Sequence, residues 1–232
     1  YRRAFGVLMK LYIGSIDCFD SADRRAVSDT LDAVELQRTE RLQREEDKAR
    51  TLLGRHLAVT ALKRADSEHG GDKDFVPVIV RDDRGKPRAV NSDMSFSISH
   101  SGKTVVCAID KMPIGVDAEE IKPCNPRVAG RICTERELDY VSGGRDISEL
   151  PLTDGRCTDR AFLMRLLRVW TAKEAFFKCI GTGITDLKSA DIFDMEPHLC
   201  NMDTDDCVCT LYSERTGFSR SDVEVIYVTK QH

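Results

Sequence analysis

The chain lacks the features that would assign it to a membrane or a nucleic-acid partner. No apolar run approaches the roughly 18 residues that a membrane-spanning helix needs. The net charge is −4, which argues against nonspecific binding to nucleic acid, although arginines gather between residues 38 and 55. We therefore expect neither a membrane nor a nucleic acid among its partners.

Cysteines are present, but not in the spacing of a metal site. The chain has 9, an odd number, and no two are separated by the two-residue gap of zinc knuckles. Cys107 and Cys179 lie in apolar segments and are predicted to be buried thiols. This pattern favours a reducing, intracellular compartment, and we expect a cytoplasmic protein.

The composition is typical of globular domains, with 41% hydrophobic and 32% charged residues in a chain of 232. That length suits one domain or two compact subdomains that share an interface. The early apolar segment FGVLMKLYIGSID is interrupted by Lys10, and no small-residue cleavage pattern follows it. We interpret it as a strand and not as a signal peptide.

Hydrophobic periodicity predicts an α+β fold built from two similar halves, residues 1–112 and 113–232, that meet near Met112 and Pro113. The pattern of the first half predicts strand 8–16, a helical region over 28–65, strand 75–80, a turn over 82–88, and strands 96–99 and 105–109, which form a meander with strand 114–118 at the start of the second half. The second half predicts a helix opened by Thr134, a polar loop over 142–160, helix 161–180, and strands 207–212 and 223–228.

Two carboxylates lie on the strand that opens the second half. Asp117 and Glu119 point to the same face, because side chains alternate along a strand with period two. Like charges this close are unfavourable unless something neutralises them, and a hard cation such as Mg²⁺ does so with oxygen ligands. Taken alone, the motif fits a solvated acidic strand end better than a metal site.

One helix face carries Trp170, Glu174 and Lys178 at successive four-residue intervals. The simple interpretation is a core tryptophan followed by a helix ion pair worth a few tenths of a kcal/mol. The functional interpretation requires Glu174 to meet Asp117 across the fold, as a third oxygen ligand, with Lys178 facing phosphates bound to the metal.

Three weaker signals lie upstream. His100 is predicted at a strand-to-turn junction, where it and its serine neighbours are either solvated or in contact with phosphate. Lys86 and Arg88 flank a glycine–proline turn that is either ordinary or part of a nucleotide site. Arg50 alone is an ordinary helix arginine.

In combination and in this order, the motifs resemble those of the 4′-phosphopantetheinyl transferases of the long, two-half (pseudodimeric) class, which activate carrier proteins. The family patterns are G-x-D-x-E and W-x-x-K-E-[AS]-x-x-K, and the chain has GVDAE at 115–119 and WTAKEAFFK at 170–178. The SHSG segment at 99–102, the GKP turn at 85–87 and the helix segment at 46–54 also fit. The resemblance extends from about residue 38 to about residue 195.

The resemblance implies that the 4′-phosphopantetheine arm of coenzyme A moves to a serine of an apo acyl, peptidyl or aryl carrier protein, with release of adenosine 3′,5′-bisphosphate. It implies Mg²⁺ held by Asp117, Glu119 and Glu174. The implied coenzyme A contacts are Asp117, Ser99 and Lys178 at the phosphates, Arg50, His100 and Arg38 at the 3′-phosphate, and Gly85, Lys86 and Pro87 along the adenine.

Glu174 and Lys178 are the predicted catalytic residues. Lys178 would stabilise charge on the bridging oxygens, and Glu174 is the first candidate base, directly or through a water. Glu137 matches a glutamate of the family and is the second candidate. The alternative for Glu137 is structural, because Thr134 and Glu137 have the spacing of a capping box.

The chain departs from the family pattern in two places. Ser97 stands where many members have asparagine, which puts a contact at that position in doubt. The loop over 142–160 is longer than in compact members, and in the family this region lies near the docking site of the carrier protein. Fatty-acid, polyketide and nonribosomal-peptide carriers therefore all stay open.

Two other functions share parts of this site. A Mg²⁺-dependent nucleotide phosphohydrolase would use the carboxylates and the lysine without a protein acceptor. A non-catalytic coenzyme A-binding module would use Arg50, Lys86 and His100 but not the acidic residues. By analogy with the family, two halves in one chain favour a monomer.

Overall fold

The apolar segments of the chain form two main sheets in a computed structural model, which describes residues 9–183 and 186–229. The first sheet, in the order β11-β1-β5-β4, contains β1 (Met9–Ser15), β4 (Ser95–Ser101), β5 (Thr104–Asp110) and β11 (Val223–Val228). The second, in the order β6-β10-β9, contains β6 (Ile114–Glu120), β9 (Leu199–Asn201) and β10 (Cys207–Ser213). The α+β prediction is confirmed.

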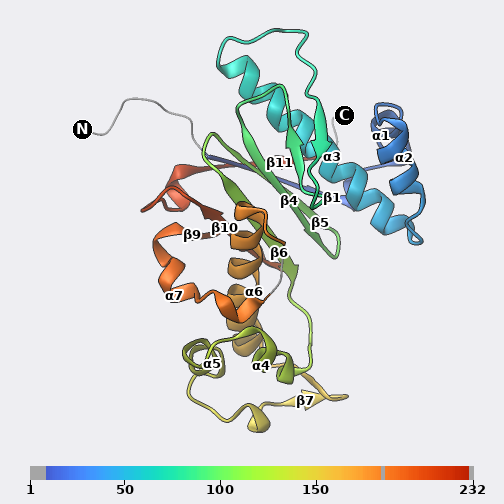
Figure 1. Ribbon diagram of the computed structural model, residues 1–232. Helices are drawn as coiled ribbons and strands as arrows, with labels where there is room; N and C mark the ends of the chain where they lie inside the picture. The colour runs from blue at the N-terminus through green and yellow to red at the C-terminus, as the bar shows by residue number, and fades with distance from the viewer. Residues whose placement is uncertain (1–8, 184–185, 230–232) are drawn as a thin grey trace.

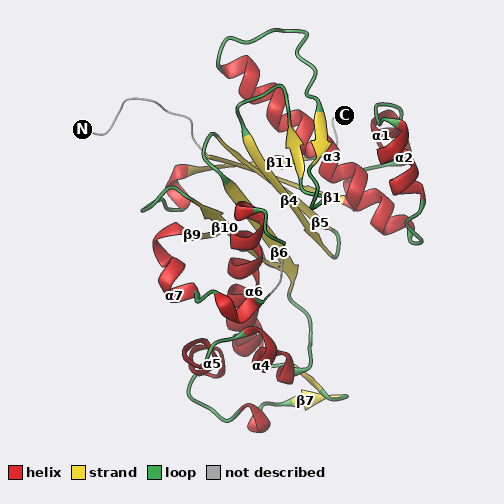
Figure 2. Ribbon diagram, in the orientation of Figure 1, coloured by secondary structure: helices red, strands yellow, loops and turns green. Residues whose placement is uncertain are grey.

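Helices pack against these sheets and against one another, as Figures 1 and 2 show. They are α1 (Ser21–Ser28), α2 (Ala33–Glu40), α3 (Glu45–Glu68), α4 (Ala129–Ile132), α5 (Glu135–Ser142), α6 (Arg160–Ile180) and α7 (Ile192–Met195). Two small hairpins complete the fold, β2 (Ile79–Arg81) with β3 (Pro87–Ala89) and β7 (Leu152–Thr153) with β8 (Arg156–Cys157). Among the helices of the described residues, none combines the length and apolar character needed to cross a bilayer.

The two faces of the first sheet are both buried. Tyr12 and Cys107 point toward α3, where they join a core that includes Leu57 and Leu62. The opposite face, which carries Leu11, packs against the second sheet in a separate core. This burial on both sides explains why β1 and β5 are apolar at nearly every position instead of alternating.

The last strand of the chain returns to the first sheet. β11 pairs in parallel with β1, with Met9 opposite Val223 and Gly14 opposite Val228. A strand from the second half of the sequence therefore completes the sheet of the first half.

The prediction of one continuous helical region over 28–65 is wrong, because the region is interrupted. The structure divides it between α2 and α3, while α1 already ends at Ser28 and α3 continues to Glu68. Asp20 and Asp32 start α1 and α2 by accepting backbone N–H groups of the first turn, so each marks a new helix. Periodicity could not show these starts, because it continues across the short breaks.

The predicted meander is also corrected. β4 and β5 pair as expected, but β6 joins β10 in the second sheet. The reason is that β1 already pairs with the remaining edge of β5. The predicted strand 75–80 shrinks to β2, and the polar loop over 142–160 contains the β7–β8 hairpin and the buried residues Leu150 and Cys157. Sequence patterns gave no sign of α7 or β9.

Helix α6 matches its prediction and lies unusually close to β6. A Cβ atom at Gly115 would lie 1.8 Å from the carbonyl oxygen of Ala175. The glycine of the GVDAE segment is therefore required by the close approach of helix and strand. That approach places the acidic residue of α6 beside those of β6.

Substitution of Gly115 by alanine should lower the free energy of unfolding by about 3 kcal/mol or more, because the added carbon collides with a backbone atom. Gly130→Ala is the matched control. A Cβ there meets no atom within 4 Å and the residue lies in α4, so stability should stay level or rise by up to about 1 kcal/mol. Chemical denaturation measures both changes, and equal stability of the two variants would contradict the close-contact argument.

Candidate active site

A pocket of about 440 Å³ opens where the two sheets meet. It is enclosed by α2, α3, β4, β6 and α6. Its lining includes eight of the residues singled out in the sequence, namely Arg50, Pro87, Ser99, His100, Asp117, Glu119, Glu174 and Lys178. Residues from both halves of the chain thus meet in one cavity, as the functional interpretation of the helix motif required.

Asp117 is the centre of the polar contacts in this pocket. Its Oδ1 atom accepts hydrogen bonds from Ser99 Oγ at 2.7 Å and from Lys178 Nζ at 2.6 Å. Lys178 also donates to Ser99 Oγ at 2.9 Å. The Oδ2 atom of Asp117 is buried and has no hydrogen-bond partner among the described residues. Since a buried charged oxygen without a partner is costly, this atom is suited to a cation.

Lys178 forms its ion pair with Asp117 on β6 and not with Glu174 on its own helix. The simple interpretation of the motif as an i,i+4 helix pair is therefore wrong for this lysine. Trp170 does fit its simple interpretation, since it packs against the apolar cluster of α4, α5 and α6.

Glu174 is buried in the pocket wall, with 7% of its surface exposed. Burial and the neighbouring Asp117 carboxylate raise the pKa of Glu174 to about 7, although the Lys178 ammonium opposes this. Burial likewise raises the pKa of Glu119. The Lys178 ammonium thus acts on three neighbouring carboxylates, those of Asp117, Glu119 and Glu174.

The three carboxylates provide the oxygen donors that Mg²⁺ prefers, and the unpaired Oδ2 atom of Asp117 is consistent with a cation between them. In the part of the chain that the structure describes, however, no three carboxylate, histidine or cysteine side chains are arranged to hold a metal ion. The Oδ1 atom of Asp117 already has a cationic partner in the Lys178 ammonium.

Serine hydroxyls also join β4 to β6 beside the pocket. Ser97 Oγ accepts the backbone N–H of Val116 at 3.1 Å, and Ser101 Oγ donates to Glu119 Oε2 at 2.8 Å. Ser101 also accepts the N–H of Glu120 at 3.0 Å. Ser97 thus makes a structural contact where many family members have asparagine. The sequence analysis missed the role of Ser101 in holding Glu119, although the period-two spacing of these serines was visible.

The basic side of the pocket is formed by Arg50 and His100. Arg50 donates to the carbonyl oxygen of Gly102 at 2.6 Å and also pairs with Asp47. Partial desolvation, together with the Arg50 and Lys178 cations, lowers the pKa of His100. Both groups line the cavity from elements of the first half, α3 and β4, and Arg55 and Arg81 of the same half line it too.

The other predicted nucleotide contacts lie elsewhere. Arg38 is exposed on α2 and is not among the residues that line the pocket. Gly85 and Lys86 line an adjoining groove of about 270 Å³, which shares Pro87, Glu174 and Lys178 with the pocket. The Lys86 ammonium contacts the end of α6 instead of the cavity.

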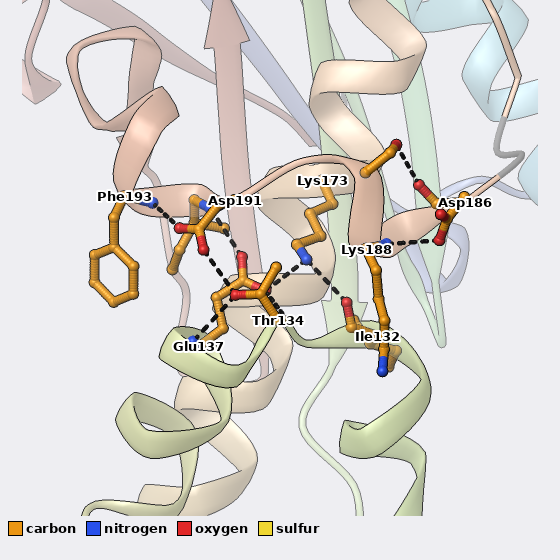
Figure 3. A network of polar contacts seen from close by, with 10 residues as sticks. Ile132, Thr134, Glu137, Lys173, Asp186, Lys188, Asp191 and Phe193 are labelled. Atoms are coloured by element: carbon orange, nitrogen blue, oxygen red, sulfur yellow. Dashed lines mark hydrogen bonds and ion pairs between the residues drawn. The ribbon is translucent and has the colours of Figure 1, made fainter.

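Glu137, the second candidate base, lies outside this pocket in a buried network (Figure 3). Its carboxylate pairs with Lys173 at 2.5 Å, and the side chains of both residues are fully buried. It also accepts the backbone N–H groups of Thr134 at 2.7 Å and Ile192 at 2.8 Å. The predicted capping box with Thr134 is confirmed, and Glu137 joins α5, α6 and the first residue of α7.

Comparison with known proteins agrees with this geometry. Residues 113–219 match a family described as the 4′-phosphopantetheinyl transferase superfamily. A 4′-phosphopantetheinyl transferase from Bacillus subtilis is 32% identical over 157 residues, covering 66% of this chain and 62% of that protein. The transferase Sfp of Bacillus subtilis strain 168 is 31% identical, covering 64% and 59%.

A third relative, the transferase psf-1 of Bacillus pumilus, is 38% identical over 104 residues, covering 44% of this chain and 38% of that protein. The matched segment thus spans about 60% of the length of the first two relatives. These matches confirm the family resemblance that the motifs carry.

The pKa of Glu174 predicts a pH dependence of stability in metal-free protein. Because its folded-state pKa of about 7 exceeds the ordinary 4.5, the folded state binds this proton more tightly, and stability falls as pH rises from about 4.5 to about 7. Glu174→Gln removes this loss, which is on the order of 3 kcal/mol at full ionisation. When unfolding is measured in EDTA at several pH values, the free energy of unfolding of the variant should rise relative to that of the wild type as the pH increases through this window. A constant difference would contradict the raised pKa.

The Glu137–Lys173 pair predicts a large stability effect. Glu137→Ala should cost about 3–5 kcal/mol, because it leaves a buried ammonium without its counter-charge. The double variant Glu137→Leu, Lys173→Met removes both charges and should recover part of that loss. Chemical denaturation of the single and double variants tests this, and a double variant less stable than Glu137→Ala would contradict the claim that the unpaired ammonium causes the loss.

Proposed function

We propose that the chain transfers the 4′-phosphopantetheine arm of coenzyme A to a serine of an apo carrier protein and releases adenosine 3′,5′-bisphosphate. The observation that carries this proposal is the single pocket that gathers Asp117, Glu119, Glu174 and Lys178 from one half with Ser99 and His100 from the other. The relatives named 4′-phosphopantetheinyl transferase support the same reaction.

In this proposal the nucleotide of coenzyme A lies on the basic side of the pocket. Arg50 and His100 face the 3′-phosphate, and an approaching phosphate dianion favours the protonated form of His100, whose pKa is low in the free protein. Arg38 needs a change of side-chain position to join them. The GKP turn contributes Pro87 to the pocket wall along the adenine.

Asp117, Glu119 and Glu174 are the residues that would hold Mg²⁺, which supplies positive charge against the pyrophosphate when bound. Lys178 adds a second positive charge at the same place, within reach of both Asp117 and Ser99. These charges stabilise the negative charge that develops on the bridging oxygen as the bond between the two phosphates breaks.

Glu174 is the proposed base. The serine hydroxyl of the carrier protein attacks the β-phosphorus, its proton passes to Glu174, and the bond to the α-phosphate oxygen breaks. Glu174 suits this role because it lines the pocket beside Asp117 and Lys178, where the reacting phosphates would lie. Glu137 is unsuited to this task, because it is fully buried against Lys173 and does not line the pocket.

We further propose that residues 1–112 and 113–232 form a pseudodimer that acts as a monomer in the cytoplasm. In support, each main sheet packs against one long helix, α3 or α6, and the pocket lies between the two units. All nine cysteines lie in the described residues and are free thiols, as a reducing compartment would maintain.

The transferase reaction can be tested by intact mass spectrometry of the carrier protein. The protein is mixed with coenzyme A, Mg²⁺ and several apo carrier proteins, and a gain equal to one phosphopantetheinyl arm is expected, lost when Mg²⁺ is chelated. Release of phosphate or free phosphopantetheine without a carrier would favour the phosphohydrolase. Coenzyme A binding that is equally tight with and without Mg²⁺, with no transfer, would favour a binding module.

Glu174→Gln should reduce turnover by at least about 10²–10³-fold while the protein stays folded, because it removes both the base and one acidic ligand. Glu196→Gln, an exposed residue outside the pocket, is the matched control and should retain full activity. The folded double variant Glu137→Leu, Lys173→Met should also retain transfer. Near-normal turnover of Glu174→Gln would exclude its assignment as base.

A further inference from the structure

The tip of the β2–β3 hairpin contacts the C-terminal end of α6. Lys86 Nζ donates hydrogen bonds to the backbone carbonyl oxygens of Lys178, at 2.5 Å, and Cys179, at 3.0 Å. Arg84 Nη1 donates to the carbonyl oxygen of Gly181 at 3.1 Å. A hairpin of the first half thereby holds the end of the helix that carries the motif of the second half.

These contacts satisfy groups that a helix leaves unpaired. The last four carbonyl groups of α6 have no partner within the helix. Gly181, in the left-handed conformation, donates its N–H to the Phe177 carbonyl oxygen. The Lys86 ammonium donates to the next two carbonyl oxygens along the helix. A cation at this end also interacts favourably with the helix dipole. Lys86 is half-buried, and burial lowers the pKa of its ammonium.

The carbonyl that Lys86 binds belongs to Lys178 itself. Lys178 is therefore held at two points, its backbone by Lys86 and its ammonium by Asp117 and Ser99. Because the last turn of a helix frays readily, loss of the first contact loosens the backbone from which the ammonium is positioned.

We propose that Lys86 is a positioning residue that fixes Lys178 by capping α6, and that it is not a direct contact of the nucleotide. This inference rests on the proposed transferase function. It differs from the role along the adenine that the family resemblance implies for the GKP turn. A nucleotide contact would require the ammonium to leave two carbonyl oxygens that it already binds.

A double-mutant cycle separates these two roles. The variants are Lys86→Met, Lys178→Met and the two combined, and the measurements are kcat and the KM for coenzyme A. We expect Lys86→Met to lower kcat by about 10- to 100-fold with little change in KM, because small displacements of a catalytic group are that costly. In the Lys178→Met background, the same change should have almost no further effect. A raised KM with unchanged kcat, or independent effects of the two changes, would overturn the proposal.

A second measurement does not depend on activity. Hydrogen exchange in peptides that cover residues 174–183 should be faster in Lys86→Met than in the wild type, because the last turn of α6 opens more often. Unchanged exchange there would also overturn the proposal. If exchange is faster in Lys86→Met but the wild type transfers phosphopantetheine to no carrier, the transferase function and the catalytic part of the inference are overturned. The capping contact itself would still stand.

Two controls complete the design. Lys63→Met changes an exposed lysine of α3 outside the pocket and should leave both exchange and kcat unchanged. Lys86→Arg keeps N–H donors at this position and should retain slow exchange and most of kcat. Full loss of kcat in Lys86→Arg, with exchange still slow, would show that the ammonium acts on the substrate and not on the helix.

Discussion

The structure depends on the burial of the Asp117 carboxylate between β4, β6 and α6. A charge in this position is costly unless it is paired, and Lys178 and Ser99 pair only one of its oxygen atoms. Gly115 makes the arrangement possible by letting α6 approach β6 closely. The remaining oxygen is buried without a partner, and Glu119 and Glu174 add two carboxylates nearby, so the same constraint that shapes the fold also makes this site suited to a cation.

The seam between the two sheets explains why this pocket exists. β4 and β6 are the edge strands of their sheets, yet they share no backbone pairing in the described parts of the chain. Hydroxyl groups of Ser97, Ser99 and Ser101 bridge the strands instead. These bridges hold the carboxylates of β6 in place, whereas a continuous ladder would have merged the two sheets.

The sequence could predict what depends on local pattern. Helix α6 was predicted to within one residue because its apolar period is long and Gly181 ends it. The shared face of Asp117 and Glu119 followed from strand alternation. The roles of Lys86 and Ser101 could not be predicted, since each depends on an approach between segments far apart in the chain. The start of α2 was missed because Asp32 interrupts the helical period only briefly.

A seam made of hydroxyl bridges needs support elsewhere, and β11 provides it. This strand leaves the second half and pairs with β1 along its full length. Lys10 of β1 is buried beside Glu68 of α3 and Glu224 of β11, and Arg64 pairs with Glu224 at 2.7 Å. Separating the two halves would therefore require breaking a sheet and a charge network at the C-terminal end of α3. These contacts lie away from the pocket. They therefore hold the two walls of the site in position without occupying the space that the substrate needs.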